Sequence, residues 1–170
     1  MYQELEPAKT NTLSLLRKGW WSPVYKLTDN VKDYGELSYS GISKRNATAE
    51  TAHCTIKFSF EAIFSKTILI TNNNGEVIGE CTRELLSRTR NLTLTSGFSA
   101  RFYRPSFFSR EYVWESDGYG KIMAIQNNFP FTLTTDVQLY STNTPATVIP
   151  LTIFLGAHLI ILRRRKRAIH

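Results

Sequence analysis

The sequence predicts a mainly β domain that consists of antiparallel hairpins and ends in one strongly apolar helix. Three observations lead to this prediction: a turn unit that occurs three times, further runs of alternating apolar and polar residues, and an apolar segment near the C-terminus. A chain of 170 residues suits one domain, and it is long enough to bury a substantial core without disulfides or metals.

The repeated unit is an alternating apolar run, an Asp- or Asn-rich turn, a glycine and a second alternating run. Its three copies are Val24–Tyr39, Ile68–Glu80 and Tyr112–Ile125. Glycine, Asn and Asp accept the positive φ angles that tight hairpin turns need. Three hairpins of one type in a chain of this size indicate a β-meander, a sandwich or a barrel.

Further strands are predicted between and around these hairpins. Alternation runs through Thr48–Phe60, Asn91–Tyr103 and Phe131–Tyr140, where aromatic and β-branched residues dominate, as is typical of strands. An apolar cluster within residues 13–21 is expected to pack on the edge of the domain. The segment Thr82–Ser87 is compatible with either a short helix or a bulged strand.

The segment Val148–Leu162 is apolar on almost every side, so a helix here lies either inside a protein or in a membrane. Pro150 fits the first helical turn, which leaves 13 residues and roughly 20 Å of apolar helix. The hydrocarbon core of a bilayer needs about 30 Å. We therefore expect a buried core helix, and the alternative is a transmembrane segment at about 146–162.

The net charge of +7 is unevenly distributed along the chain. The run Arg163–Arg167 supplies five of the 21 basic residues, and without it 16 basic residues face 14 acidic ones. The remaining chain is close to neutral in total, which argues against a broad nucleic-acid-binding face. One interpretation of the run is a solvated helix end that complements the helix dipole. The second is a contact with anionic lipid, whose candidate residues are Arg163, Arg164, Arg165, Lys166 and Arg167, and the third is a contact with nucleic acid.

No catalytic or cofactor motif is present in the sequence. It lacks a Gly-x-Ser-x-Gly elbow, a Walker loop, a dinucleotide fingerprint and a His-Glu-x-x-His motif, so we expect no enzyme, no cofactor and no metal site. Asp29 is assigned to turn chemistry, and His158 is assigned to a hydrogen-bonded core histidine. Cys54 and Cys81 are expected to be half-buried thiols of a reducing compartment.

Hairpins with turns such as Asn72–Gly75, followed by the apolar helical segment Gly156–Leu162 and basic residues, resemble the tubby C-terminal-like superfamily. That superfamily includes the phospholipid scramblases and the plant LURP-one-related proteins. The resemblance covers Trp20–Arg165, and it implies a closed antiparallel barrel of about 12 strands around the C-terminal helix. The helix residues expected to fill this barrel are Ile153, Phe154, Leu155, Leu159 and Ile161.

The resemblance also divides the chain into three parts. Residues 1–19 are expected to be a leader, and residues 20–165 a single barrel domain whose central helix spans about 148–163. Residues 166–170 are expected to be a basic tail. The polar and acidic N-terminus is unlike a signal peptide, which favours a cytoplasmic protein that is peripheral to a membrane if the tail binds lipid.

Within that superfamily, tubby proteins bind phosphoinositide head groups and scramblases associate with membranes. The chain lacks the cysteine-rich run and the proline-rich extension of scramblases, and it has no motif that matches the phosphoinositide residues of tubby. The resemblance implies a non-enzymatic binding domain for membrane phospholipid or a protein partner, and nucleic acid is disfavoured. The alternatives from other classes are a tail-anchored membrane protein with a soluble β-domain and a hydrolase whose site is scattered through the fold.

Overall fold

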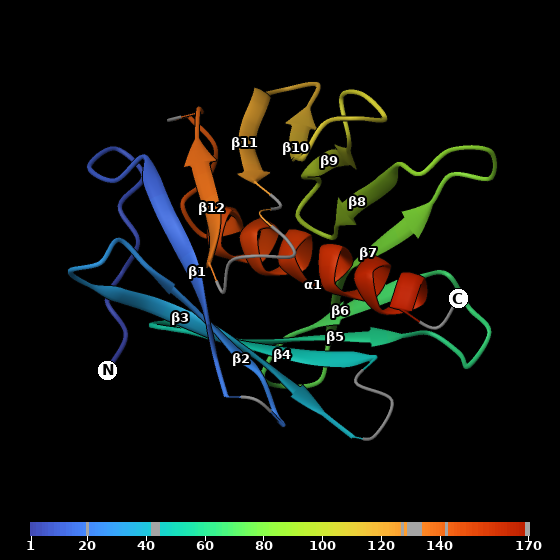
Figure 1. The fold of residues 1–170 in the computed structure, drawn as a ribbon, viewed down its shortest axis with the longest axis horizontal. Coiled ribbons are helices and arrows are strands. Elements are labelled where there is room, and N and C mark those ends of the chain that lie inside the picture. The colour runs from blue at the N-terminus through green and yellow to red at the C-terminus, as the bar shows by residue number, and fades with distance from the viewer. Residues whose placement is uncertain (20, 42–44, 127, 129–133, 142, 169–170) are drawn as a thin grey trace.

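In the described residues of the computed structural model, twelve antiparallel strands form a closed barrel around one long helix (Figure 1). The structure describes residues 1–19, 21–41, 45–126, 128, 134–141 and 143–168, without the side chains of residues 167 and 168. Its elements are β1 (Thr12–Lys18), β2 (Val24–Thr28), β3 (Asp33–Ser40), β4 (Asn46–Thr51), β5 (Thr55–Phe60), β6 (Ile68–Thr71), β7 (Val77–Arg83), β8 (Arg90–Leu94), β9 (Ser99–Tyr103), β10 (Glu111–Ser116), β11 (Gly120–Gln126), β12 (Thr134–Leu139) and α1 (Val148–Ala168).

Each strand pairs with the strands before and after it in the chain, and β1 pairs with β12 to close the barrel. The alternation of the strands gives the barrel an apolar inner face. In β5, for example, Ile56 and Phe58 are buried, whereas Lys57 between them is exposed. The predicted fold class, a closed antiparallel barrel of about 12 strands around one apolar C-terminal helix, is therefore confirmed.

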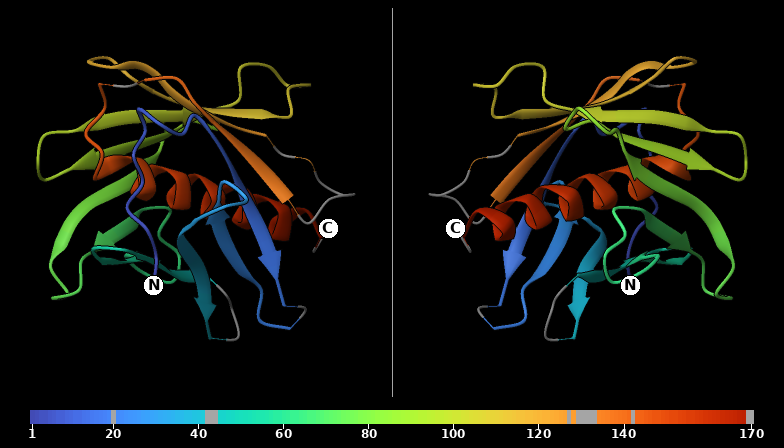
Figure 2. Two further views of the ribbon diagram at one scale, coloured as in Figure 1. Left: turned by 90° about the vertical axis from the view of Figure 1, so that its left-hand side faces the viewer. Right: turned by 90° about the vertical axis from the view of Figure 1, so that its right-hand side faces the viewer.

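The helix α1 runs lengthwise through the barrel (Figure 2). All five predicted core residues are buried there, and none exposes more than 6% of its surface. Burial of such a side chain contributes roughly 1.5–3 kcal/mol, so these residues alone stabilise the fold by an amount comparable to its net stability. They are Ile153, Phe154, Leu155, Leu159 and Ile161. Among the described residues, no helix has the length and apolar character to cross a bilayer.

Two glycines allow the helix to approach the barrel wall closely. A Cβ atom on Gly156 of α1 would lie 2.6 Å from Ile125 Cδ1 and 2.8 Å from Trp114 Nε1. A Cβ atom on Gly35 of β3 would lie 2.4 Å from a backbone oxygen of β4 and 3.1 Å from the ring of Phe154. A larger residue at either position would push the helix and the wall apart, and close packing leaves no room for that shift.

The predicted leader and tail both contribute to regular elements, which corrects the boundaries at residues 20 and 166. Leu13 and Leu15 of β1 are buried, and β1 completes the barrel between β2 and β12. The alternation of these leucines gives the segment an inner face, which a leader would not need. The helix continues to Ala168, beyond the predicted end near 163, because Arg and Lys favour helices and complement the dipole at a C-terminus.

Two long predicted strands are hairpins in the structure. Tight turns at 52–54 and 95–98 divide Thr48–Phe60 into β4 and β5 and Asn91–Tyr103 into β8 and β9. Across 95–98 the inward positions stay in phase, from Leu92 and Leu94 to Ala100 and Phe102, so the sequence pattern hides that reversal. Across 52–54 the inward phase shifts by one residue, from Ala47 and Ala49 to Ile56 and Phe58. In the undecided segment 82–87, β7 ends at Arg83 and a connection follows. Of the predicted last strand, residues 131–133 lie outside the described residues.

Candidate functional site at the basic end of the barrel

The topology sorts the connections between strands into two ends of the barrel. Because neighbouring strands are antiparallel, the connections β1–β2, β3–β4, β5–β6, β7–β8, β9–β10 and β11–β12 lie at one end, and the others lie at the opposite end. The C-terminal part of α1 reaches the first end, where Arg163 donates a hydrogen bond to the backbone carbonyl of Arg88, between β7 and β8. In Figure 1 the C-terminus and the connections β5–β6 and β7–β8 lie together on the right.

We define the basic end as the described residues of those connections, the strand residues that flank them, and Arg163–Lys166. Among the described side chains, 13 basic residues belong to this end, against three acidic ones, Glu61, Glu84 and Glu111. The rest of the described molecule has six basic and 11 acidic residues and is net negative. The 13 basic residues are Arg17, Lys18, Arg45, Lys66, Arg83, Arg88, Arg90, Arg104, Arg110, Arg163, Arg164, Arg165 and Lys166.

This distribution shows that the near-neutral total of the chain outside Arg163–Arg167 hides a separation of charge. The total is close to neutral because an excess of cations at one end is offset by carboxylates on the walls and at the opposite end. The sequence places basic residues at the end of β1 and in or beside the connections that follow β3, β5, β7 and β9, and only the barrel topology brings them together. A charge arranged in this way produces a strong local field that the net charge does not reveal.

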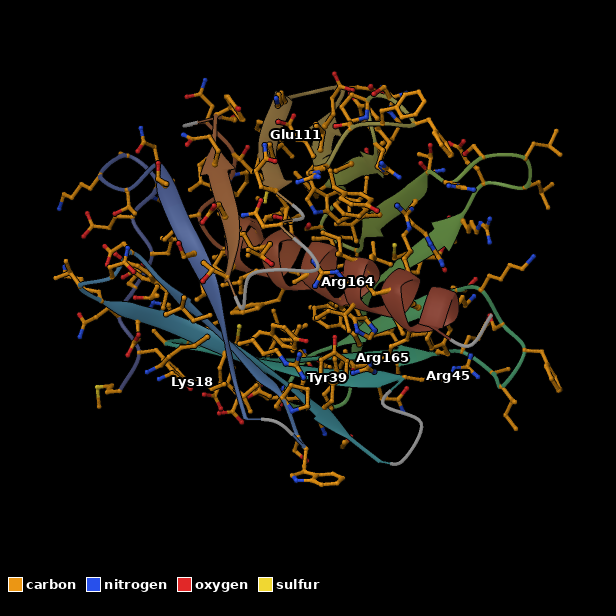
Figure 3. The ribbon with its side chains drawn as sticks, viewed as in Figure 1. Lys18, Tyr39, Arg45, Glu111, Arg164 and Arg165 are labelled. Carbon is orange, nitrogen blue, oxygen red and sulfur yellow. The ribbon has the colours of Figure 1, made fainter. Side chains whose placement is uncertain are left out.

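Three of the predicted site residues, Arg163, Arg164 and Arg165, are half-buried in the barrel end and do not form a solvated run. The guanidinium of Arg163 lies 5.1 Å from the ring centre of Tyr112, and that of Arg165 lies 4.6 Å from the ring centre of Tyr39 (Figure 3). A cation over the face of an aromatic ring is stabilised by the ring quadrupole. Burial lowers the pKa of Arg163 and of Arg164 from the ordinary value. These arginines therefore belong partly to the packing of the helix end.

Lys166, the next predicted site residue, is exposed at the end of the helix. Partial desolvation lowers the pKa of its ammonium group, and the nearby cations Arg90, Arg83 and Arg45 lower it further. The side chain of Arg167 lies outside the described residues. Cations from the helix and from several connections thus contribute to one positive field, which is the arrangement that attracts an anionic partner.

Arginines of the basic end also bind backbone carbonyls of neighbouring connections. Arg45 Nη1 donates to the carbonyl of Ile63, and Arg90 Nη1 donates to the carbonyl of Lys66, both at 2.6 Å. Within the described part of the chain, neither arginine forms an ion pair. These hydrogen bonds hold the β5–β6 connection in place from two sides, and they leave the positive charge without a carboxylate to neutralise it.

The sequence prediction missed the apolar side chains that lie among these cations. Adjacent pairs of large apolar residues are exposed in three successive connections: Ile63–Phe64, Leu85–Leu86 and Phe107–Phe108. A sequence signal for them exists, because one tripeptide pattern recurs at intervals of 22 residues: Phe64-Ser65-Lys66, Leu86-Ser87-Arg88 and Phe108-Ser109-Arg110. The tripeptide Ile42-Ser43-Lys44 continues the series one interval earlier but lies outside the described residues.

His158 lies inside the barrel, fully buried, with Nδ1 3.0 Å from the hydroxyl oxygen of Tyr39. Burial, assisted by Arg165 and Arg90, lowers the pKa of His158 to about 3, so its imidazole is neutral at physiological pH. The ring also stacks on Phe58, with the ring centres 5.9 Å apart. The prediction of a hydrogen-bonded core histidine is therefore confirmed.

The remaining assignments concern Asp29 and the two cysteines. Asp29 Oδ1 accepts hydrogen bonds from the backbone N–H groups of Val31 and Lys32, which confirms its role in the turn. Both cysteines are free thiols, but Cys54 is exposed and Cys81 is fully buried, so the expectation of two half-buried thiols is wrong. Among the described side chains, no group of His, Cys, Asp and Glu is placed to hold a metal ion.

Two surface hollows lie away from the basic end. One, of about 290 Å³, is lined by residues that include Lys9, Asn11 and Tyr140, and the other, of about 190 Å³, by residues that include Arg101 and Asp117. Both lie on the walls or near the opposite end.

The fold and the site define a class: a closed antiparallel β-barrel with a central C-terminal helix and one strongly basic end. No protein-family model, curated protein or solved structure matches the chain. The barrel and its helix agree with the architecture that the tubby-like resemblance implies, whereas membership of that superfamily is not shown.

Proposed function

We propose that this chain is a binding module for membranes that contain anionic phospholipids and that its basic end faces the membrane. The observation that carries the proposal is the gathering of 13 described basic side chains, against three acidic ones, at one end of the barrel. A membrane surface offers many phosphate groups at once, and each basic residue near such a surface contributes about 1 kcal/mol. Arginine is well suited to this role because its guanidinium binds phosphate oxygens in pairs.

A tubby-like relationship, which we propose on architecture alone, supports the same function, because tubby proteins bind phosphoinositide head groups. The absence of enzymatic activity stays a prediction. Arg163 and Arg165 are not the best positions for a test, because they pack on aromatic rings and their loss would disturb the barrel end. Exposed lysines that make no such contact separate binding from folding more cleanly.

The test compares two double variants that have the same change in net charge. Lys66→Gln with Lys166→Gln removes two exposed cations from the basic end, and Lys32→Gln with Lys57→Gln removes two exposed cations from elsewhere. At about 1 kcal/mol per cation, the first variant should bind phosphatidylserine vesicles about 30-fold more weakly in co-sedimentation at low salt. The second should bind nearly as the unchanged chain does, because its charges do not face the vesicle.

Three results would contradict the proposal. Equal losses in the two variants would mean that net charge alone governs binding, with no membrane-facing end. Equal binding to neutral phosphatidylcholine vesicles would remove the role of anionic lipid. The unchanged chain could also fail to bind any vesicle and bind single-stranded RNA tightly. The basic end would then be a nucleic-acid-binding surface, because nucleic acid also attracts clustered cations.

A further inference from the structure

The connections β5–β6, β7–β8 and β9–β10 share one design at their tips. Each presents two adjacent large apolar side chains to solvent, and the exposed fractions are among the highest in the described chain: 75% and 96% for Ile63 and Phe64, 98% and 103% for Leu85 and Leu86, 69% and 90% for Phe107 and Phe108. Scattered apolar residues on a surface are ordinary, but neighbouring exposed pairs in successive connections are not.

A serine follows each pair and closes the same local turn. The backbone N–H two residues after the serine donates to its Oγ at 3.0 Å in all three connections: Thr67 to Ser65, Thr89 to Ser87 and Glu111 to Ser109. The residue between serine and donor is basic and exposed in every case, namely Lys66, Arg88 and Arg110. The turn therefore holds an apolar pair and a cation at fixed positions beside one another.

The three tips are linked to one another and to the helix end. The guanidinium of Arg88, in the β7–β8 connection, lies 5.9 Å from the ring centre of Phe107, in the β9–β10 connection. Arg90 binds the carbonyl of Lys66 and so joins the start of β8 to the β5–β6 connection. Arg163 of α1 binds the carbonyl of Arg88. The exposed pairs are therefore carried by a connected rim, in which Arg45 also lies beside the helix end (Figure 3).

We propose that these three apolar pairs insert into the interfacial layer of an anionic membrane while Lys66, Arg88 and Arg110 bind lipid phosphates. This inference rests on the proposed function and adds the depth and the orientation of binding. Apolar side chains gain free energy when they leave water for the acyl boundary, and cations beside them remain at the level of the head groups. Charge complementarity selects the anionic bilayer as the occupant, because the tips belong to the end of the barrel that carries the 13 described basic side chains.

The opposite end of the barrel provides the internal control. Its exposed apolar residues, among them Val31, Val77 and Tyr119, stand singly in or directly beside tight turns that contain Asp or Asn. An acidic residue lies in each of these three turns, namely Asp29, Glu76 and Asp117. An anionic surface would repel that end, so insertion is expected only at the basic end.

The first experiment measures vesicle binding as a function of salt. Leu85→Ser with Leu86→Ser removes one apolar pair and keeps every charge, and Val31→Ser with Val77→Ser is the matched control at the opposite end. With phosphatidylserine vesicles, the unchanged chain should stay bound at 0.5 M salt, because inserted apolar groups are not screened. The Leu85–Leu86 variant should bind at low salt but lose about tenfold or more in affinity at high salt, and the control variant should behave as the unchanged chain does.

The second experiment measures depth with a fluorescent label that reports polarity. Cys54→Ser removes the exposed thiol, and the buried Cys81, whose pKa burial raises to about 12, does not react. In this background, a label at Leu86→Cys should shift to the blue on vesicles and be quenched by nitroxide lipids, whereas a label at Val31→Cys should show neither change.

The outcomes separate the two proposals. Anionic-vesicle binding that is abolished by salt in the unchanged chain, with a label at position 86 that stays in water, would overturn insertion and leave electrostatic docking intact. A chain that binds no vesicle at all would overturn both. Equal responses from labels at positions 86 and 31 would also overturn insertion, because binding would then lack an orientation.

Discussion

The two ends of the barrel are built from connections of different kinds. At the opposite end, the connections between strands are three to five residues long, and side chains such as Asn72 accept hydrogen bonds from their own turn. Gly75 and Gly120 supply the positive φ angles that these turns require, 78° and 68°. At the basic end the connections are five to seven residues long, and they expose large apolar and basic side chains.

This difference shows which residues the fold requires. The short turns satisfy their own backbone groups and reverse the chain, so their composition follows from closing a hairpin. The longer connections perform the same reversal with residues that gain nothing from folding, because exposed leucine or phenylalanine contributes no burial. Folding therefore explains the composition of the opposite end, but not the exposed apolar pairs of the basic end.

The largest effect on stability is expected from a substitution in the helix inside the barrel, because both ends of the barrel depend on that helix. Leu155 is fully buried, and Leu155→Asp would place a charge in a closed apolar interior. We expect destabilisation by about 4 kcal/mol or more, measured by urea unfolding with circular dichroism. The control is Leu85→Asp, the same change at a side chain that is 98% exposed, which should shift stability by less than about 0.5 kcal/mol. A cooperative transition of unchanged midpoint in Leu155→Asp would place the helix outside the core.

The next effect is a pH dependence of the free energy of unfolding, which arises from His158 inside the barrel near the basic end. The pKa of His158 is about 3 in the folded state and near its ordinary value when the chain is unfolded. Between these two pKa values the unfolded state binds a proton that the folded state does not. The free energy of unfolding should therefore fall as the pH is lowered from about 6.5 toward 3, by up to about 1.4 kcal/mol per pH unit. His158→Leu should flatten this slope in urea unfolding measured from pH 7 to pH 4. Identical slopes in both proteins would show that the imidazole is not held neutral in the fold.

The smallest effects compare the two kinds of connection directly. Asp29→Ala removes an acceptor of two backbone hydrogen bonds at the opposite end, and it should cost about 1 kcal/mol of stability while leaving vesicle binding unchanged. Leu85→Ser with Leu86→Ser should do the reverse, with a stability change within about 0.5 kcal/mol and a clear loss of vesicle binding in salt. Thermal unfolding and co-sedimentation on the same preparations provide both quantities. If each variant lost both stability and vesicle binding, the two kinds of connection would not differ in role.

Much of the fold could be predicted because it depends on local patterns. Alternation and turn residues mark the strands, and the all-round apolar character of 148–162 marks the core helix. The turn at 95–98 leaves no break in the alternation, because it preserves the inward phase, whereas the turn at 52–54 shifts that phase by one residue. β1 was assigned to a leader because its partner, β12, lies far away in the sequence, and only closure of the barrel makes it a wall strand.

The site was predicted only in part, and the reason is topological. The run Arg163–Arg167 is visible because its charges are adjacent in the sequence. The other cations of the basic end are spread over the end of β1 and four connections with their flanking residues, and a count over the chain averages them with the carboxylates of the walls and the opposite end. The sequence does contain one signal that the connections β5–β6, β7–β8 and β9–β10 are alike. It is the tripeptide that recurs every 22 residues, once for each pair of strands. It predicts a shared surface only once the strands are known to close into a barrel.

The most direct test of the account is hydrogen–deuterium exchange of the unchanged chain with and without phosphatidylserine vesicles. We expect the vesicles to slow exchange in the connections β5–β6, β7–β8 and β9–β10 and to leave the turns at β2–β3, β6–β7 and β10–β11 as they are in solution. One sample then reports both ends of the same molecule without any substitution. Slower exchange at the opposite end, or equal slowing at both ends, would contradict the claim that the basic end is the membrane-facing surface.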